Sequence, residues 1–123
     1  MKVVYEYSHL GGSEILTVRH PEIEKEIYQI ISSVHARKTK ISNEKTMKGK
    51  ALFNPVDMNQ QFLGLFTQYQ FVELRDTYTI RIPNWDKEIR GAYKQIDFTK
   101  NKVNVEVQFG KYAIMFYDMA KFQ

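Results

Sequence analysis

The sequence predicts an α/β (α+β) fold in which a β-sheet is flanked by helices. Two stretches, residues 21–34 and 55–69, repeat apolar side chains at helical spacing, and residues 103–109 alternate apolar and polar side chains. The length of 123 residues suits one small domain, residues 1–123. Eight Phe, eight Tyr and one Trp provide ample material for a core.

The first element expected is a short strand over residues 1–7, ended by His9 and a turn at Gly11-Gly12. We interpret His9 as a histidine hydrogen-bonded at the strand end rather than as a functional group. A helix is predicted from Pro21 to Val34, because proline suits the first helical position and glutamates follow it in the first turn. Its buried stripe would contain Ile23, Ile27, Ile30, Ile31 and Val34.

The segment from residue 37 to residue 50 is the most basic part of the chain. It contains a single acid, Glu44, against six basic residues: Arg37, Lys38, Lys40, Lys45, Lys48 and Lys50. Such a composition suits contacts to phosphate oxygens, which carry affinity but no sequence information. From composition alone, a mobile charged loop is an equally good interpretation.

A second helix is predicted to begin at Pro55, with a strand following over residues 77–82 that stops at Pro83-Asn84. Trp85 then heads a polar connection, D-K-E-I-R-G. The core face of the helix would contain Met58, Phe62, Leu65, Phe66 and Tyr69. Asn59 and Gln60 are interpreted as surface or capping groups.

The stretch from Tyr93 to Phe109 predicts a β-hairpin. With Lys100-Asn101 as a two-residue turn, Asp97 would face Asn104. Glu106 would then lie diagonally from Asp97, at a Cα separation of roughly 7–8 Å. Two carboxylates at that spacing can share one hard divalent cation, and Gln108 would point the same way. On pattern alone such a polar face is usually just solvated, but the flanking residues are rather apolar for a freely solvated hairpin.

The pattern D-F-x-K-x-x-V-x-V-E-V-Q-F, continued by Gly110-Lys111-Tyr112, resembles the catalytic hairpin of the BglII/BstYI family of type II restriction endonucleases. It resembles BamHI more distantly. Further blocks fall in the same order as in that family: Tyr7-Ser8-His9-Leu10-x-Gly12, Thr39-Lys40, Glu44-Lys45-Thr46, Gly49, Pro55-Val56 and Asn59. The resemblance implies the restriction-endonuclease-like core of the PD-(D/E)xK superfamily, with a central mixed sheet.

The resemblance also implies Mg²⁺-dependent hydrolysis of DNA phosphodiester bonds. Asp97 and Glu106 would hold the metal together with the backbone carbonyl of Val107. Gln108 stands where the wider superfamily usually has Lys, and it would orient the attacking water. Glu73 is the candidate for an additional catalytic acid from the preceding strand, although it is also readily explained as a surface acid.

By resemblance, the substrate is double-stranded DNA with a GATC-centred palindrome, RGATCY or AGATCT, cut by a homodimer within a restriction-modification system. Lys111 would donate to guanine O6 or N7, or would instead contact phosphate at a helix start. Lys40, Lys45 and Lys48 are the candidates for phosphate contacts in the basic segment.

A C-terminal helix is expected from Ala113 to Phe122. Enzymes of this family continue well beyond that point, so we expect that a C-terminal part is missing. Two further functional interpretations stay open: a catalytically inactive, DNA-binding remnant of such an enzyme, and a repair or structure-specific nuclease on the same fold.

Composition excludes several other classes of protein. The absence of cysteine excludes disulfides and thiolate metal sites, and the three histidines lack zinc-site spacing. No apolar run is long enough to span a membrane, and no signal-peptide pattern is present, so the cytoplasm is the expected location. The net charge of +4 mildly favours an anionic partner.

Overall fold

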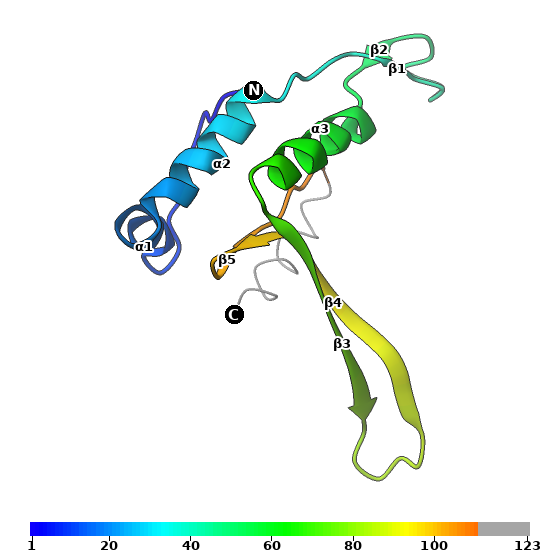
Figure 1. Ribbon diagram of the computed structural model, residues 1–123. Helices are drawn as coiled ribbons and strands as arrows, with labels where there is room; N and C mark the ends of the chain where they lie inside the picture. Colours follow the sequence, from blue (N-terminus) through cyan, green and yellow to red (C-terminus); the bar gives the residue numbers. More distant parts are fainter. Residues whose placement is uncertain (111–123) are drawn as a thin grey trace. The chain divides into compact units, whose positions relative to one another are not determined.

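The computed structural model describes residues 1–110, which contain helices and antiparallel strand pairs and so confirm the predicted α+β class (Figure 1). The chain divides into two compact units, residues 1–70 and the part from residue 71 onward. That the chain is one domain stays a prediction. The first unit contains α1 (Gly12–Arg19), α2 (Pro21–Ser33), β1 (Lys40–Ile41), β2 (Ala51–Leu52) and α3 (Pro55–Gln68). The second contains β3 (Val72–Arg81), β4 (Glu88–Lys100) and β5 (Val103–Val105).

Helix α2 confirms the expectation drawn from its proline and its isoleucine stripe. Pro21 occupies the first turn, and Ile23 and Ile30 are buried, as is Val34 at the C-cap. The helix contacts both α1 and α3. The N-terminal ammonium group donates to the carbonyl of Val34 at 2.5 Å, so the beginning of the chain is held at the end of α2.

Helix α3 begins at Pro55, as predicted. The side chain of Asn54 caps it, because Oδ1 accepts the backbone N–H groups of Val56 and Asp57. Three of the five expected core residues are buried, and the other two are half-buried: Met58, Phe62 and Phe66, then Leu65 and Tyr69. Pro55 and the 3.6-residue period of the apolar side chains were together sufficient to predict this helix.

The N-terminal expectation was wrong. Residues 1–7 form no strand, and α1, which the sequence did not indicate, follows the turn at Gly11. None of the α1 side chains is buried, so the helix carries no apolar stripe that a periodicity argument could find. Its start is stabilised locally instead, since Ser8 Oγ accepts the backbone N–H of Ser13 at 3.2 Å.

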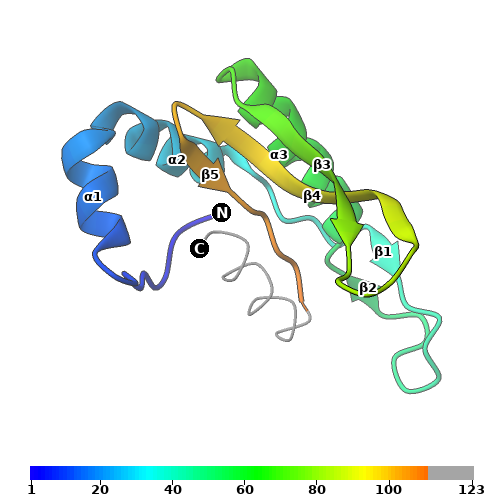
Figure 2. The ribbon, with the colours of Figure 1, turned by 90° about the horizontal axis from the view of Figure 1, so that it is seen from below.

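The basic segment forms a hydrogen-bonded loop between the paired strands β1 and β2 (Figure 2). Ser42 is buried, its backbone N–H donates to Lys50, and its carbonyl accepts from Gly49. Its hydroxyl accepts the N–H of Glu44 at 3.2 Å. The hydrogen bonds of Ser42 therefore hold the loop together, and the lysines of the loop are exposed.

The predicted strand over residues 77–82 is real but longer, because β3 begins at Val72. The polar connection predicted after Trp85 was partly wrong, since Glu88–Gly91 belong to β4. The two strands pair antiparallel and form the long two-stranded ribbon of Figure 1. Cross-strand pairing, for example between Arg81 and Glu88, stabilises strand here despite the polar composition.

The hairpin after β4 has a different turn from the one predicted. Asn101 and Lys102 form it, with φ angles of 49° and 69°, and Phe98 pairs with Val105 rather than with Val103. Positive φ at both central positions is the geometry of a type I′ turn, and asparagine tolerates it at the first of them. The register therefore differs by two residues. Strand β5 also ends at Val105, short of the predicted Phe109.

The helices of residues 1–110 are short. The longest, α3, has 14 residues, and none in this part of the chain is long and apolar enough to cross a bilayer.

Candidate active site

Asp97 lies at an irregularity in strand β4. Val72 of β3 pairs with Thr99, whereas Leu74 pairs with Ile96. The two residues Asp97 and Phe98 therefore oppose one residue on β3, as in a β-bulge. Bulges bend a strand and re-aim its side chains, and they are frequent next to active sites. Phe98 is buried and Asp97 is half-buried, so the carboxylate sits at the edge of the packed region.

The carboxylate of Asp97 reaches the chain beyond β5. Its Oδ2 accepts the backbone N–H of Val107 at 3.1 Å. The β4–β5 register, continued by one step past the Phe98–Val105 pair, brings position 106 opposite position 97. Asp97, Glu106 and Val107 are all half-buried. These three predicted site residues therefore lie on adjoining backbone segments. In this register position 106 is directly opposite position 97, whereas the sequence predicted that the two would be diagonal neighbours.

Gln108 lies one residue beyond this contact, outside any strand and exposed to solvent. Its side-chain Nε2 donates to the carbonyl of Gly110 at 2.7 Å. Gln108 is therefore available to polar groups in solution rather than packed into the core.

Glu73, the predicted additional acid, is exposed and is the β3 residue that faces the bulge. Within residues 1–110 no three or more His, Asp or Glu side chains gather in a way that could hold a metal ion. Glu73 therefore does not complete a trio with Asp97 and Glu106 in this structure.

The predicted DNA contacts fall partly within the described chain. Lys40, Lys45 and Lys48 are exposed on β1 and the loop that follows it. The ammonium of nearby Lys38 lies 5.2 Å from the ring centroid of Phe53, a cation–π contact. Lys111 and the predicted helix from Ala113 to Phe122 lie outside the described residues.

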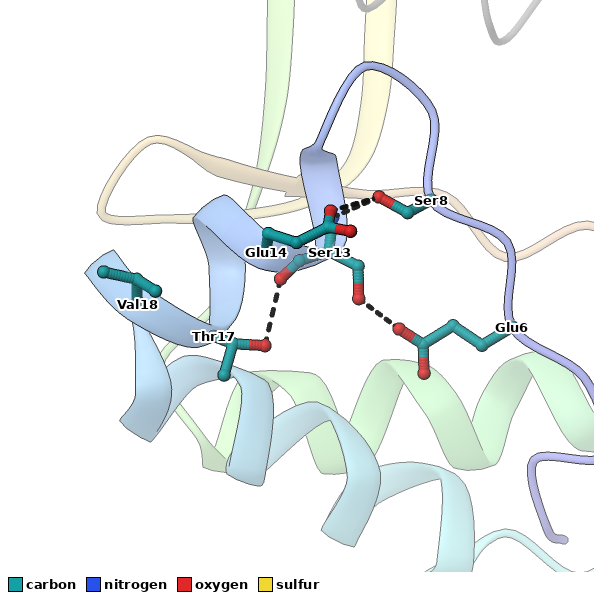
Figure 3. A pocket seen from close by; sticks show the side chains of 6 residues that line it. All are labelled: Glu6, Ser8, Ser13, Glu14, Thr17 and Val18. Atoms are coloured by element: carbon teal, nitrogen blue, oxygen red, sulfur yellow. Dashed lines mark hydrogen bonds between the residues drawn. The ribbon is translucent and has the colours of Figure 1, made fainter.

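A second group of polar side chains lies in the first unit, around an open pocket of about 440 Å³ (Figure 3). Its lining residues come from the N-terminal segment and α1: Glu6, Ser8, Ser13, Glu14, Thr17 and Val18. Hydroxyl donors satisfy both acids, since Ser13 donates to Glu6 and Ser8 donates to Glu14. Sequence reasoning missed this group, because it depends on the undetected helix.

These hydrogen bonds, together with one from Tyr28 to Glu6, shift the pKa values of the groups that they join. The Ser13 hydroxyl, followed by that of Tyr28, lowers the pKa of Glu6, and the Ser8 hydroxyl lowers the pKa of Glu14. The pKa of Tyr28 is raised, because its hydroxyl donates to Glu6 at 2.5 Å. The pocket is thus a structural network of carboxylates and hydroxyls.

The chemistry of the hairpin site is different. The carboxylates of Asp97 and Glu106 and the carbonyl of Val107 supply only oxygen atoms, the donors that Mg²⁺ prefers. Two protein carboxylates suffice for Mg²⁺, which keeps several of its waters. The donor set therefore fits a hard divalent cation, although one oxygen of Asp97 already accepts the N–H of Val107.

Comparison with known proteins shows the family of the chain. The family model described as Endonuc-BglII, Restriction endonuclease BglII/BglIII, matches residues 4–123. No curated protein matches the chain. The family match spans nearly the whole sequence and includes both the basic loop and the hairpin. The chain therefore belongs to the BglII/BglIII family of restriction endonucleases, type II nucleases that cleave DNA.

Proposed function

We propose that this endonuclease hydrolyses DNA phosphodiester bonds with Mg²⁺ at the hairpin site. The observation that carries the proposal is the contact between the carboxylate of Asp97 and the backbone of Val107. It joins the acid at the β4 bulge to the segment that contains Glu106. This contact supports the proposal, because it holds the acid of β4 against the half-buried segment that would supply the other oxygen donors.

In this proposal Asp97 and Glu106 hold the cation, and the carbonyl of Val107 adds a neutral oxygen. When bound, Mg²⁺ would supply positive charge against the phosphate and would acidify a water molecule. Gln108, exposed beside these groups, would accept or donate a hydrogen bond to the attacking water and so orient it.

The basic loop would provide affinity for the DNA backbone. Lys40, Lys45 and Lys48 are exposed, and the hydrogen bonds around Ser42 fix the loop that carries two of them. Phosphate contacts position DNA without reading its sequence. Base reading would then fall to other groups, with Lys111 as the proposed donor to guanine.

By family resemblance, the proposed target is a GATC-centred palindrome, cut by a homodimer whose two-fold axis coincides with that of the DNA. The enzyme would act in the cytoplasm as the nuclease of a restriction-modification system, because that is where its DNA substrate would be met. It would belong to the PD-(D/E)xK superfamily with Gln108 in place of the usual lysine.

Plasmid cleavage tests the proposal. The chain is incubated with plasmids that contain or lack GATC, in Mg²⁺ or in EDTA, as wild type, Asp97→Ala and Asp86→Ala. Asp86 is the matched control, because it is an exposed aspartate in the loop between β3 and β4. We expect Mg²⁺-dependent cleavage at GATC that Asp97→Ala abolishes and Asp86→Ala retains.

Each other outcome contradicts part of the proposal. Cleavage that ignores GATC would indicate a structure-specific or repair nuclease. DNA that is bound and retarded but never cut would indicate an inactive remnant. Cleavage by Asp97→Ala at the wild-type rate would remove Asp97 from the catalytic site.

A further inference from the structure

The segment between α2 and β1 is held by α3 rather than by a core of its own. Residues 35–39 form neither helix nor strand, and all five are exposed (Figure 1). Burial of apolar side chains therefore does not fix the path of this backbone. The segment contains Arg37 and Lys38 and leads directly into Lys40, so its path decides where these three cations lie.

Gln61 of α3 binds both backbone groups of one residue in this segment. Its Oε1 accepts the N–H of His35 at 2.8 Å, and its Nε2 donates to the carbonyl of His35 at 3.0 Å. Nε2 also donates to Oδ2 of Asp57, one turn earlier on the same helix, at 3.0 Å. Because a carboxylate only accepts hydrogen bonds, Asp57 fixes the amide in the orientation that binds His35.

Asn54 holds the following part of the segment. Its backbone N–H donates to the carbonyl of Arg37 at 3.2 Å, and its side-chain Nδ2 donates to the hydroxyl of Thr39 at 3.1 Å. The same side chain caps α3 through Oδ1. Three alternate residues, at positions 35, 37 and 39, are therefore each tied to α3 or to its N-cap.

The side chain of Lys38 is directed by the same end of α3. Its ammonium lies 5.2 Å from the ring centroid of Phe53, the residue immediately before Asn54. Both Lys38 and Phe53 are exposed, so the pair lies at the surface and the ammonium stays accessible to an anion.

We propose that Gln61 is a positioning residue for DNA binding. It touches no DNA itself but holds residues 35–39 in one path, so that Arg37 and Lys38 meet phosphate oxygens in a segment that is already ordered. A segment that is ordered before it binds loses less backbone entropy on binding. The inference rests on the proposed contacts between the basic segment and DNA. It deepens them by adding two cations and by naming what holds them.

Backbone amide relaxation, measured by NMR on the isotope-labelled full chain without DNA or metal, tests the holding step. In wild type we expect order parameters of about 0.85 for residues 35–39, as in a rigid backbone. Gln61→Ala should lower them below about 0.6 at residues 35–37 but not in α3. Gln60→Ala, at the exposed neighbouring position of the same helix, is the matched control and should leave them unchanged. Unchanged values in Gln61→Ala would overturn the inference.

Fluorescence anisotropy on duplex DNA in EDTA tests the positioning step apart from cleavage. Gln61→Ala should weaken binding by about fivefold or more, whereas Gln60→Ala should bind as wild type does. The slope of log K against log salt should stay within about 1 of the wild-type slope, because the same phosphate contacts form once the segment is ordered. A residue that only stabilises the fold would lower the thermal unfolding midpoint without changing the affinity of the folded chain.

A double-mutant cycle identifies the groups through which Gln61 acts. In a chain that carries both Arg37→Ala and Lys38→Ala, the further change Gln61→Ala should weaken binding by less than about twofold, because the cations that it positions are gone. An undiminished effect of Gln61→Ala in that background would overturn the inference.

The outcomes separate this inference from the proposed function. If Gln61→Ala binds DNA as tightly as wild type while joint replacement of Lys40, Lys45 and Lys48 with alanine weakens binding, the positioning role alone is overturned. If neither variant changes binding, the basic segment does not contact DNA, and the proposed phosphate contacts are overturned together with the positioning role.

Discussion

Asp97 combines two local features, a position in the β4 bulge and a hydrogen bond to the backbone of Val107. The bulge arises from pairing with β3, and the hydrogen bond ties the carboxylate to the segment after β5. A residue in a regularly paired part of the strand would lack the bulge. The geometry at this residue is what makes a shared cation with Glu106 physically reasonable.

Lys102 has a backbone conformation that residues other than glycine rarely adopt. Its φ of 69° lies in the left-handed region, where a side chain costs roughly 1–2 kcal/mol. Lys102→Gly should therefore raise the free energy of unfolding by about 1 kcal/mol, since Asn-Gly is the favoured type I′ pair. Urea denaturation measures the change. A loss of stability would contradict the turn at Asn101 and Lys102.

Glu6 gives a prediction about pH. The hydroxyls of Ser13 and Tyr28 donate to Glu6 and lower its folded pKa below the ordinary value of 4.5, so these hydrogen bonds add stability above that pH. That contribution is lost as the pH falls through the lowered folded pKa. The stability deficit of Ser13→Ala relative to wild type should accordingly be smaller at pH 3 than at pH 7, as measured by denaturation at both. An equal deficit at both pH values would show that Ser13 acts without Glu6.

At the scale of the element, the helices and strands differ in how well the sequence predicted them. Pro21 and Pro55 mark the first turns of α2 and α3, and the apolar stripes that follow are local patterns, so both helices were predictable. The bulge at Asp97 was not, because it depends on which β3 residues pair with β4, a contact between distant parts of the sequence. Helix α1 was missed because it buries no side chain.

Helix α3 should owe its stability to its buried face. Phe66 is almost fully buried and its ring centroid lies 6.1 Å from that of Phe62. Phe66→Ala should lower the free energy of unfolding by about 3–5 kcal/mol, because it removes buried surface and leaves a cavity. The matched control is Leu63→Ala on the exposed face of α3, which should change it by less than about 0.5 kcal/mol. Equal losses in the two variants would contradict the assignment of the faces.

At the scale of the whole molecule, each unit has one prominent feature besides the hairpin site: the basic loop in the first unit and the long β3–β4 ribbon in the second. Composition predicted the basic loop, because its basic residues all fall within one short stretch of the sequence, residues 37–50. The long β3–β4 ribbon was not predicted, because part of the polar sequence D-K-E-I-R-G, which suggested a loop, belongs to β4. The change of register at the β4–β5 hairpin is two residues, and an even shift preserves the two faces of a strand, so the predicted faces of the hairpin did not change.

The basic loop yields a prediction for the molecule as a DNA-binding protein. Replacing Lys40, Lys45 and Lys48 together with alanine should reduce the salt dependence of DNA binding, because each lost phosphate contact removes about 0.9 from the slope of log K against log salt. A fall of about 2–3 in the slope is expected by fluorescence anisotropy on duplex DNA. A control variant, Lys87→Ala in the loop between β3 and β4, should leave the slope unchanged. An unchanged slope in the triple variant would place DNA elsewhere.

The most direct measurement is paramagnetic broadening of the backbone amide signals by Mn²⁺ in the isotope-labelled chain, because it locates a cation without requiring cleavage. The account predicts broadening centred on residues 97 and 106–108 that Mg²⁺ reverses, that Asp97→Asn abolishes and that Asp86→Asn retains. Broadening centred on Glu6 and Glu14 instead, or unaltered by Asp97→Asn, would contradict a metal site on the hairpin.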